Sequence, residues 1–484
     1  MAIPATPHQG PPRTIGLLRG KVGPQVTIEQ HDTVVDDVSS NAPVGTIGLL
    51  NFDGQGADGL APPDTNGAVG ATQYVQWVNI EYNVYDKTTG AKILGPISGN
   101  SFWSGFGGGC QSQNAGDIII LYDQIADRWV AAQPAFDATP YLMCVAISTT
   151  NDATGSYFRY AFATPNNTRD FPDYPKWGIW PDAYYLSYEV FKNGITDNNF
   201  EACAADRTNM LIGNPATMQC FAAATGTHQG LPASLDGQNL PPAGAPNHYV
   251  HLASTTKNLD QFDFHVNFTT PSLSTFTGPT VITTAAFTEI CSNGTNRNCI
   301  KQPSGGEGLD SLGDRLMYRN AYRNFGSYES MLDTHTVKPG GTSTAVGAVR
   351  WYELRSTPPG GAFTAFQSGT VQTPSISLWM ASIAQDKLGD IALGFSASST
   401  SLDPSVLYTG RVPTDGLGLM EGPKIVIKGT GVQKSTSDRW GDYSSLALDP
   451  TDDCTFFYTQ EYIKTTGSFN WSTRVNSFKF TGCQ

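Results

Sequence analysis

One phrase recurs along the chain: an alternating run that often begins near an aspartate, then a turn, then a second run rich in β-branched and aromatic residues. Near the C-terminus it reads Asp442–Asp449, the turn Pro450–Asp453 and Cys454–Tyr462. Short alternating runs between Gly, Pro, Asn and Asp are typical of half-buried β-strands. Six earlier pairs of runs repeat the phrase: 64–71 with 74–80, 117–123 with 128–133, 174–182 with 183–191, 231–236 with 248–254, 314–322 with 328–337, and 376–386 with 389–398.

A unit repeated in this way predicts an all-β fold, which we interpret as a single seven-bladed β-propeller with about four antiparallel strands per blade. The last unit continues into a third run, Ser472–Phe480, and another β-like segment, Thr46–Phe52, precedes the first unit. We expect this N-terminal strand to complete the last blade and close the ring, which removes an exposed sheet edge. A two-domain β-sandwich is the alternative.

The domain organisation follows from the same pattern. Residues 1–45 are polar and rich in Pro and Gly, and we expect an extended arm that lies on the surface. Residues 46–484 form the predicted propeller. The start Met1–Pro4 shows neither a basic n-region nor an apolar h-region, so we expect a signal peptide that is absent from this sequence.

The chain has eight cysteines. Cys454 and Cys483 flank two runs that a turn near Gly467 folds together, and Cys203 and Cys220 bracket a turn in the same way. The remaining expected pairs are Cys291 with Cys299 and Cys110 with Cys144. Disulfides indicate an oxidising compartment, so we expect a secreted, extracellular or periplasmic protein.

Charge and composition exclude several function classes. The net charge is −13, which opposes binding to the phosphate backbone of nucleic acids. No apolar run approaches the roughly 20 residues of a membrane span. The segment Gly54–Gly59 has the spacing of a dinucleotide fingerprint, but Pro62 and Pro63 follow it where a helix is needed, so we expect no nucleotide cofactor. We expect a monomer.

Acidic residues at the starts of the first runs are the strongest candidates for a site. In a propeller these positions surround one mouth of the central channel; they are Asp64, Asp117, Asp173, Asp314 and Asp442. We predict that Asp442 and Glu461 form a general acid–base pair with separated pKa values. Asp173 is a spare carboxylate, and Tyr443 and His335 are the next catalytic candidates.

Basic and aromatic side chains near these acids suit a polar ligand such as a sugar or a uronic acid. Arginine holds a carboxylate through two hydrogen bonds, and Trp stacks on a sugar face. The predicted substrate-binding residues are Arg315, Arg439, Arg350, Trp351, Glu353, Lys176 and Trp440. The alternative is structural: these groups cap strand ends and pair with one another.

A metal site is a further hypothesis. The segment Asp64–Gly67 offers oxygen ligands in a tight loop, so Asp64 and Asn66 are candidate ligands for Ca²⁺. A plain Asx turn is the alternative.

The densest local motif is Arg439–Ser444, which reads RWGDYS, followed by Asp449–Tyr462 and Thr473–Phe480. These phrases resemble those of a widespread group of secreted bacterial proteins without an established activity, and the resemblance extends to Arg350–Glu353 and Trp379–Ser382. More broadly, the chain is similar to sialidase-like propellers, although their repeated S-x-D-x-G-x-x-W turns are missing. The resemblance implies a secreted propeller and assigns no reaction.

Two functions remain open on the sequence. The first is a secreted carbohydrate-active enzyme, a glycoside hydrolase or polysaccharide lyase that works at the channel mouth. The second is a non-catalytic extracellular propeller with a glycan-binding, adhesion or structural role. The partner expected in either case is a glycan or polysaccharide.

Overall fold

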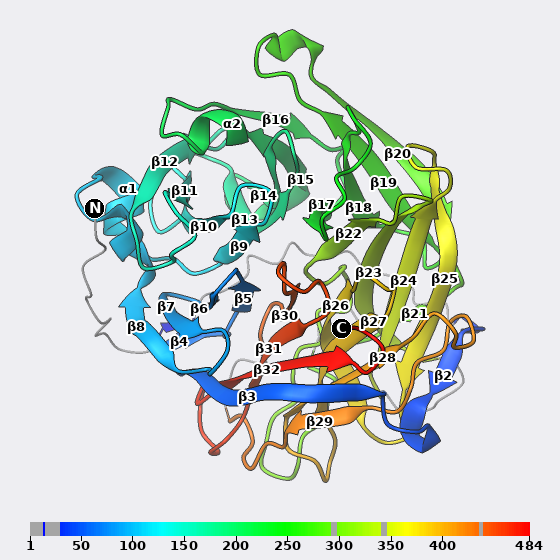
Figure 1. Cartoon of the computed structure of the whole chain (residues 1–484). Helices are drawn as coiled ribbons and strands as arrows, with labels where there is room; N and C mark the ends of the chain where they lie inside the picture. The colour runs from blue at the N-terminus through cyan, green and yellow to red at the C-terminus, as the bar shows by residue number, and fades with distance from the viewer. Residues whose placement is uncertain (1–12, 15–29, 292–297, 340–345, 435–438) are drawn as a thin grey trace.

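The computed structural model describes residues 13–14, 30–291, 298–339, 346–434 and 439–484 (Figure 1). Roughly half of these residues are in strands. Two helices of the described chain are single turns, α1 (Gly108–Ser112) and α2 (Arg207–Met210), and three 3-10 turns span Val38–Ser40, Gly99–Trp103 and Pro271–Leu273. The all-β expectation is therefore confirmed. Within the described ranges, no helix is long and apolar enough to span a membrane.

Most of the described strands form antiparallel units of four. The units are numbered here in chain order, and each of the first three is a separate sheet. Their strands are β5 (Thr65–Val69), β6 (Gln73–Val78), β7 (Glu81–Asp86) and β8 (Lys92–Ser98); β9 (Ile119–Asp123), β10 (Arg128–Ala135), β11 (Leu142–Ser148) and β12 (Tyr157–Ala163); and β13 (Phe171–Ile179), β14 (Tyr184–Lys192), β15 (Thr196–Ala205) and β16 (Met218–Ala222).

The fourth and fifth units belong to one larger sheet, because β17 pairs with β18 through its first half and in parallel with β22 through its second half. Their strands are β17 (Gly230–Asp236), β18 (Asn247–Leu252), β19 (Asn258–His265) and β20 (Thr275–Thr283), then β22 (Asn320–Asn324), β23 (Glu329–Lys338), β24 (Ala348–Ser356) and β25 (Phe363–Gln372). The short β21 (Thr288–Glu289) pairs with β23.

The sixth unit contains β26 (Ser377–Gln385), β27 (Ile391–Ser398), β28 (Ser405–Arg411) and β29 (Lys424–Ile427). The last unit contains β30 (Ser445–Leu448), β31 (Phe456–Tyr462), β32 (Ser472–Phe480) and β3 (Thr46–Gly56). β3 pairs antiparallel with β32, from Thr46 opposite Phe480 to Gly56 opposite Ser472. The N-terminal strand thus completes the last sheet, at the place where the sequence pattern put it.

The units lie around a common centre, with their first strands on the inner side (Figure 1). Neighbouring first strands contact one another in the order β5, β9, β13, β17, β22, β26 and β30, and β30 contacts β5 again. Apolar side chains fill the space between units; one cluster joins Val75 and Trp77 of β6 to Ile120 of β9 and Trp129 of β10. This packing fixes the starts of the first strands close to one another.

One predicted boundary is wrong. The run 314–322 is not a strand throughout, because β22 begins only at Asn320. Residues 314–319 are irregular, and two arginines of this segment pair with acids on other strands. Arg315 pairs with Glu189 of β14, and Arg319 pairs with Asp236 of β17.

The predicted disulfides are all present: Cys110–Cys144, Cys203–Cys220, Cys291–Cys299 and Cys454–Cys483. The last one fastens the start of the β31 hairpin to the residues after β32. Four disulfides agree with an extracellular location.

Much of the predicted arm, residues 1–12 and 15–29, lies outside the described residues. β1 (Arg13–Thr14) pairs in parallel with β4 (Leu60–Ala61). Farther on, β2 (Val35–Asp37) pairs in parallel with β25, and Val38 and Val44 are buried. This part of the segment is therefore packed against the sheets, and a domain boundary at residue 45 stays a prediction.

Candidate functional site

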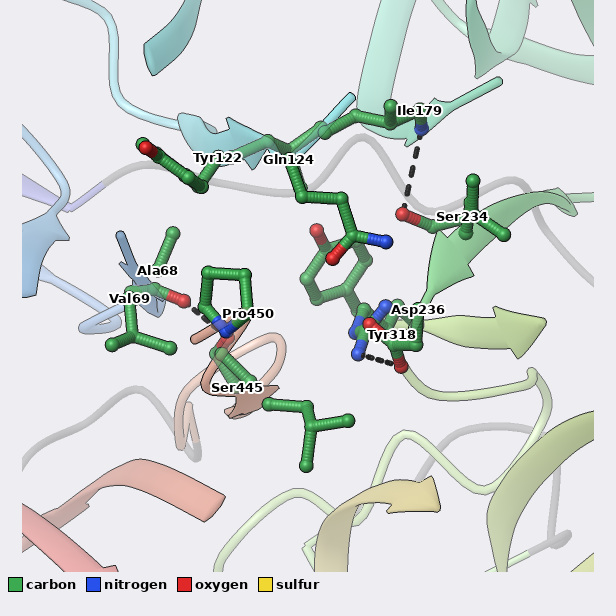
Figure 2. A pocket seen from close by; sticks show the side chains of 16 residues that line it. Ala68, Val69, Tyr122, Gln124, Ile179, Ser234, Asp236, Tyr318, Ser445 and Pro450 are labelled. Carbon is green, nitrogen blue, oxygen red and sulfur yellow. Dashed lines mark hydrogen bonds and ion pairs between the residues drawn. The ribbon is translucent and has the colours of Figure 1, made fainter. Parts of the chain in front are cut away.

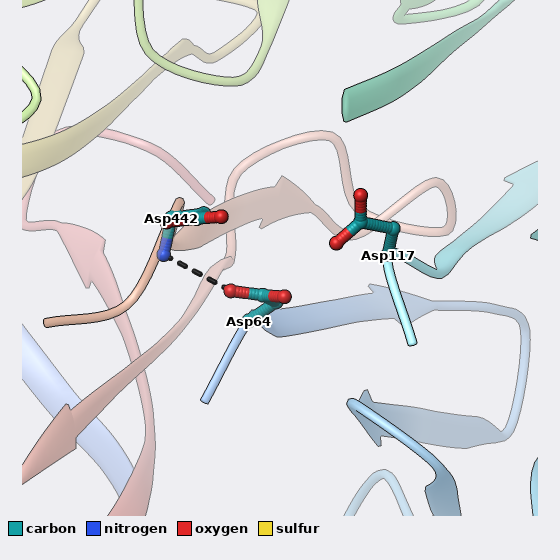
Figure 3. Close-up of side chains that lie close together, drawn as sticks. All are labelled: Asp64, Asp117 and Asp442. Carbon is teal, nitrogen blue, oxygen red and sulfur yellow. Dashed lines mark hydrogen bonds between the residues drawn. The ribbon is translucent and has the colours of Figure 1, made fainter. Parts of the chain in front are cut away.

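Three buried aspartates from three different units meet at the starts of the first strands (Figure 3). Asp64 directly precedes β5, Asp117 lies two residues before β9, and Asp442 lies three residues before β30. One carboxylate oxygen from each lies within 4.8 Å of the others. The common position at a strand start therefore does bring these side chains together.

Main-chain donors hold two of these carboxylates. The Asp442 N–H donates to Oδ1 of Asp64 at 3.1 Å, and the Tyr174 N–H donates to Oδ2 of Asp117 at 3.3 Å. Arg439 forms an ion pair with Asp442. By contrast, Oδ2 of Asp64 receives no hydrogen bond from an N–H or hydroxyl group of the described residues, and the Asp64 side chain lies close enough to that of Asp117 to share a proton with it.

Two further predicted residues, Asp173 and Lys176, enter this cluster from β13. Lys176 is fully buried, and its Nζ lies 3.4 Å from the ring centre of Tyr174 and 4.1 Å from that of Tyr443. Such cation–π contacts stabilise a desolvated ammonium group. Burial nevertheless lowers the pKa of Lys176 to about 8, while the charges of Asp117 and the other aspartates act in the opposite direction.

Burial also raises the proton affinity of the acids. It raises the pKa of Asp64 well above its usual range, and the neighbouring charges of Asp442 and Asp117 add to the shift. The pKa of Asp173 rises well above its usual range for the same two reasons, burial and the charge of Asp117. The pKa of Asp117 is raised as well, with burial as the main cause. These carboxyl groups bind protons, or another cation, more readily than exposed aspartates do.

Glu461 lies beside the same loop. Its Oε1 accepts a hydrogen bond from the Gly441 N–H, next to Asp442, and its Oε2 has no partner among the described residues. Burial raises the pKa of Glu461 well above its usual range. The predicted pair Asp442 and Glu461 is therefore placed together.

Arg315 reaches the cluster from the irregular segment before β22. Its guanidinium lies 4.7 Å from the ring centre of Tyr174 and 3.3 Å from a carboxylate oxygen of Glu189. Tyr443 is fully buried, and its hydroxyl donates to the carbonyl of Ile118 at 2.9 Å. The hydroxyl is thus engaged by the main chain just before β9, and burial together with the nearby charges of Asp64 and Asp117 raises the pKa of Tyr443 well above its usual range.

The structure does not bring the other predicted residues to this cluster. His335 on β23 is buried against Tyr352, whose hydroxyl lies 2.9 Å from Nε2, and burial lowers the pKa of His335 well below its usual range. Arg350 on β24 forms a buried ion pair with Asp32 at 2.8 Å. These strands are the second and third of their unit, farther from the centre than β22.

Three more candidates also have partners elsewhere. Glu353 pairs with Arg355 at 2.6 Å, and Trp351 is buried in an apolar cluster with residues of β26 and β27. Trp440 donates from Nε1 to Oγ of Ser396 at 3.1 Å.

Of the two predicted metal ligands, Asp64 belongs to the group of three aspartates and Asn66 does not. Oδ1 of Asn66 accepts a hydrogen bond from the Ile120 N–H at 2.7 Å, which joins β5 to β9. Asn66 is therefore a link between neighbouring first strands, and Asp117 and Asp442 are the groups that accompany Asp64. Glu189, which pairs with Arg315, was not among the predicted site residues.

A small cavity lies at the opposite ends of the first strands (Figure 2). Its lining includes the last residues of β5, β13, β17 and β30: Val69, Ile179, Asp236 and Leu448. Its volume is about 40 Å³, which suits a few waters. The first strands thus share one direction, with acids at one end and this cavity at the other.

No family model matches the sequence, and no curated protein matches it. Solved structures that resemble the fold include an endo-arabinase from Bacteroides thetaiotaomicron, at 14% identity over 67% of this chain and 95% of that chain, with a TM-score of 0.29. Trypanosoma rangeli sialidase is 10% identical over 74% of this chain and 53% of its own, with a TM-score of 0.33. The polysaccharide lyase Uly1 is 8% identical over 87% of this chain and 90% of its own, with a TM-score of 0.39.

Proposed function

We propose that the chain is a secreted carbohydrate-active enzyme, a glycoside hydrolase or a polysaccharide lyase, built on one closed seven-bladed β-propeller. The ring of contacts among first strands and the pairing of β3 with β32 support this architecture over two sandwiches. The proposed reactive end of the propeller is the end at which the first strands of the units start.

One observation carries the functional proposal: acids, cations and tyrosines from several units converge at these strand starts. A glycosidic bond is cleaved by paired groups, of which one donates a proton and the other accepts one or attacks. Glu461, with its raised pKa, is the proposed proton donor, and Asp442 is the proposed base. Asp173 is the reserve carboxylate.

The cations of the cluster define the proposed substrate class. Arg315 and Arg439 are the most exposed charged members, at 8% and 6%, and both carry planar guanidinium groups. Arginine binds a carboxylate or sulfate through two parallel hydrogen bonds. The preferred substrate is therefore an acidic polysaccharide, which must displace Glu189 from Arg315 or Asp442 from Arg439 when it binds.

A second candidate function rests on the burial of the same groups. Glu461 and Tyr443 expose none of their surface, and the arginines are already paired with acids. In a non-catalytic extracellular propeller this cluster would be a polar core that holds the first strands in place, and glycans would bind elsewhere.

A polysaccharide screen with the purified chain separates the two functions. The enzyme proposal predicts released product from at least one acidic polysaccharide, and loss of that product with Asp442→Asn. Asp403→Asn, on the loop between β27 and β28, is the matched control and is expected to keep the activity. A thermal shift without product supports the binding module, and product that survives Asp442→Asn contradicts the assignment of the site.

A further inference from the structure

The three aspartates at the strand starts connect parts of the chain that are far apart in sequence. Asp64 belongs to the first unit, Asp117 to the second and Asp442 to the last. They therefore meet where the inner strand of the last unit, β30, lies beside that of the first unit, β5, at the opposite edge of the last sheet from β3. A cation that neutralises these carboxylates would therefore also connect the first unit to the last.

An unpartnered oxygen lies inside this group. Asp64 is 1% exposed, and its Oδ2 has no hydrogen-bond donor among the described residues. The Asp64 carboxylate lies between those of Asp442 and Asp117 (Figure 3). A buried carboxylate oxygen without a donor is costly unless a proton or a metal ion compensates for it.

The side-chain charges of the surroundings do not balance. Four buried aspartates and two buried cations meet here: Asp64, Asp117, Asp173, Asp442, Lys176 and Arg439. The third cation of the cluster, Arg315, is paired with Glu189 and Asp314 and so does not compensate these aspartates. With the four aspartates and the two cations ionised, two negative charges remain, and the carboxyl of Glu461 beside Asp442 adds to this excess. A divalent cation would remove the imbalance of the six groups.

The ammonium group of Lys176 does not occupy the position of such a cation among the carboxylates. It donates to the carbonyl of Pro175 at 3.0 Å and lies against two tyrosine rings. In the described part of the chain it forms neither a hydrogen bond nor an ion pair with a carboxylate. The ammonium group thus compensates charge from a distance and leaves the oxygens of the three aspartates uncovered.

We propose that Asp64, Asp117 and Asp442 bind one Ca²⁺ ion that bridges the first, second and last units. Ca²⁺ prefers oxygen ligands at about 2.3–2.6 Å, so two of its ligands lie up to about 5 Å apart. The oxygens of the three aspartates, within 4.8 Å of one another, meet this condition. Asp173, whose Oδ2 also lacks a donor, is the nearest candidate for a further ligand. The absence of His and Cys from the group disfavours Zn²⁺.

The site is tested with the whole chain after treatment with EDTA and dialysis. We expect calorimetry to show one Ca²⁺ per chain. We also expect the melting temperature to rise by about 3 °C when free Ca²⁺ reaches a hundredfold excess over Kd. Tb³⁺, a luminescent probe of Ca²⁺ sites, should be sensitised by the nearby Tyr174 and Tyr443 and displaced by Ca²⁺.

Two variants locate the ion. Asp64→Asn and Asp117→Asn should each weaken Ca²⁺ binding at least tenfold. Without metal they should melt no lower than the wild type, because each substitution removes like-charge repulsion. Asp403→Asn is the control and should bind Ca²⁺ as the wild type does.

The outcomes are distinct from those of the enzyme proposal, because no substrate is involved. Absence of Ca²⁺ heat, melting shift and Tb³⁺ luminescence in the wild type would overturn the site, as would unchanged affinity in both variants. If the variants do not fold, Tb³⁺ stoichiometry on the wild type decides: one ion that Ca²⁺ displaces supports the site, and no bound ion overturns it.

Discussion

The main-chain N–H of Asp442 donates a hydrogen bond to the carboxylate of Asp64 across a sequence separation of 378 residues. This bond joins the loop before β30 to the start of β5, so the last unit and the first unit touch through their inner strands as well as through β3. The same loop carries Arg439 and Gly441, which contact Asp442 and Glu461. The proposed reactive groups thus lie where the last unit meets the first.

Arg350 is predicted to be a structural residue rather than a substrate ligand. Its ion pair with Asp32 is buried, so Arg350→Met should lower the free energy of unfolding by about 3–5 kcal/mol, because it leaves a buried carboxylate without its partner. Urea unfolding measures the loss. The double variant Arg350→Met with Asp32→Asn should recover much of it, and equal losses in the single and the double variant would contradict the ion-pair account.

Asp333 on β23 should make the fold less stable as the pH rises. Burial raises its pKa from 3.8 to about 8, and neither of its carboxylate oxygens has a partner in the described chain. Between these two values the folded chain holds a proton that the unfolded chain has released. The free energy of unfolding should therefore fall by up to roughly 1.4 kcal/mol per pH unit from this group.

The check is urea unfolding of wild type and Asp333→Asn from pH 4 to pH 8, a window set by the two pKa values. The stability of the wild type should decline relative to that of the variant across this range. Parallel curves would show that Asp333 does not titrate in this window.

The Cys454–Cys483 disulfide should matter more for stability than Cys291–Cys299. The first closes a loop with a sequence separation of 29 and the second one of 8. Loop entropy then gives losses of about 3.6 and 2.5 kcal/mol when each pair is replaced by alanine. Chemical unfolding of the two double variants tests the order, which a reversed ranking would contradict.

Asn66 is predicted to hold neighbouring inner strands together, not to bind metal. Asn66→Ala removes the acceptor of the buried Ile120 N–H, at a cost of about 1–3 kcal/mol. Ca²⁺ affinity, measured by calorimetry, should stay within threefold of that of the wild type. A loss of affinity as large as that expected for Asp64→Asn would return Asn66 to the ligand set.

The repeated phrase was enough to predict most of the strands and the partner of Thr46–Phe52, because these depend on local alternation and on turns. The disulfides were predicted separately, from the turns between neighbouring runs and from the spacing of the remaining cysteines. The repeated phrase also predicted that aspartates at strand starts would gather, since every first strand enters the centre in the same direction. It could not show that His335 and Arg350 lie in the interior of one unit. Their positions depend on which face of β23 and β24 packs against Phe287 and Asp32, and those partners are distant in sequence.

Burial was the other property hidden from the sequence. Asp442, Glu461 and Lys176 were expected at an open channel mouth, but their side chains are almost fully enclosed. Enclosure follows from the packing of neighbouring first strands, which no single unit specifies. The low solvent exposure strengthens every charge interaction in the cluster. The enzyme proposal therefore requires that a substrate reach these enclosed groups.

The most direct test of the enzyme proposal is the steady-state rate of Glu461→Gln on the acidic polysaccharide that the wild type degrades best. New reducing ends report a hydrolase, and ultraviolet absorbance of a new double bond reports a lyase. The account predicts a loss of about 10²–10⁴-fold in kcat, the usual contribution of a general acid, with folding unchanged and Asp403→Asn fully active. A Glu461→Gln variant that folds and retains the wild-type rate would contradict it.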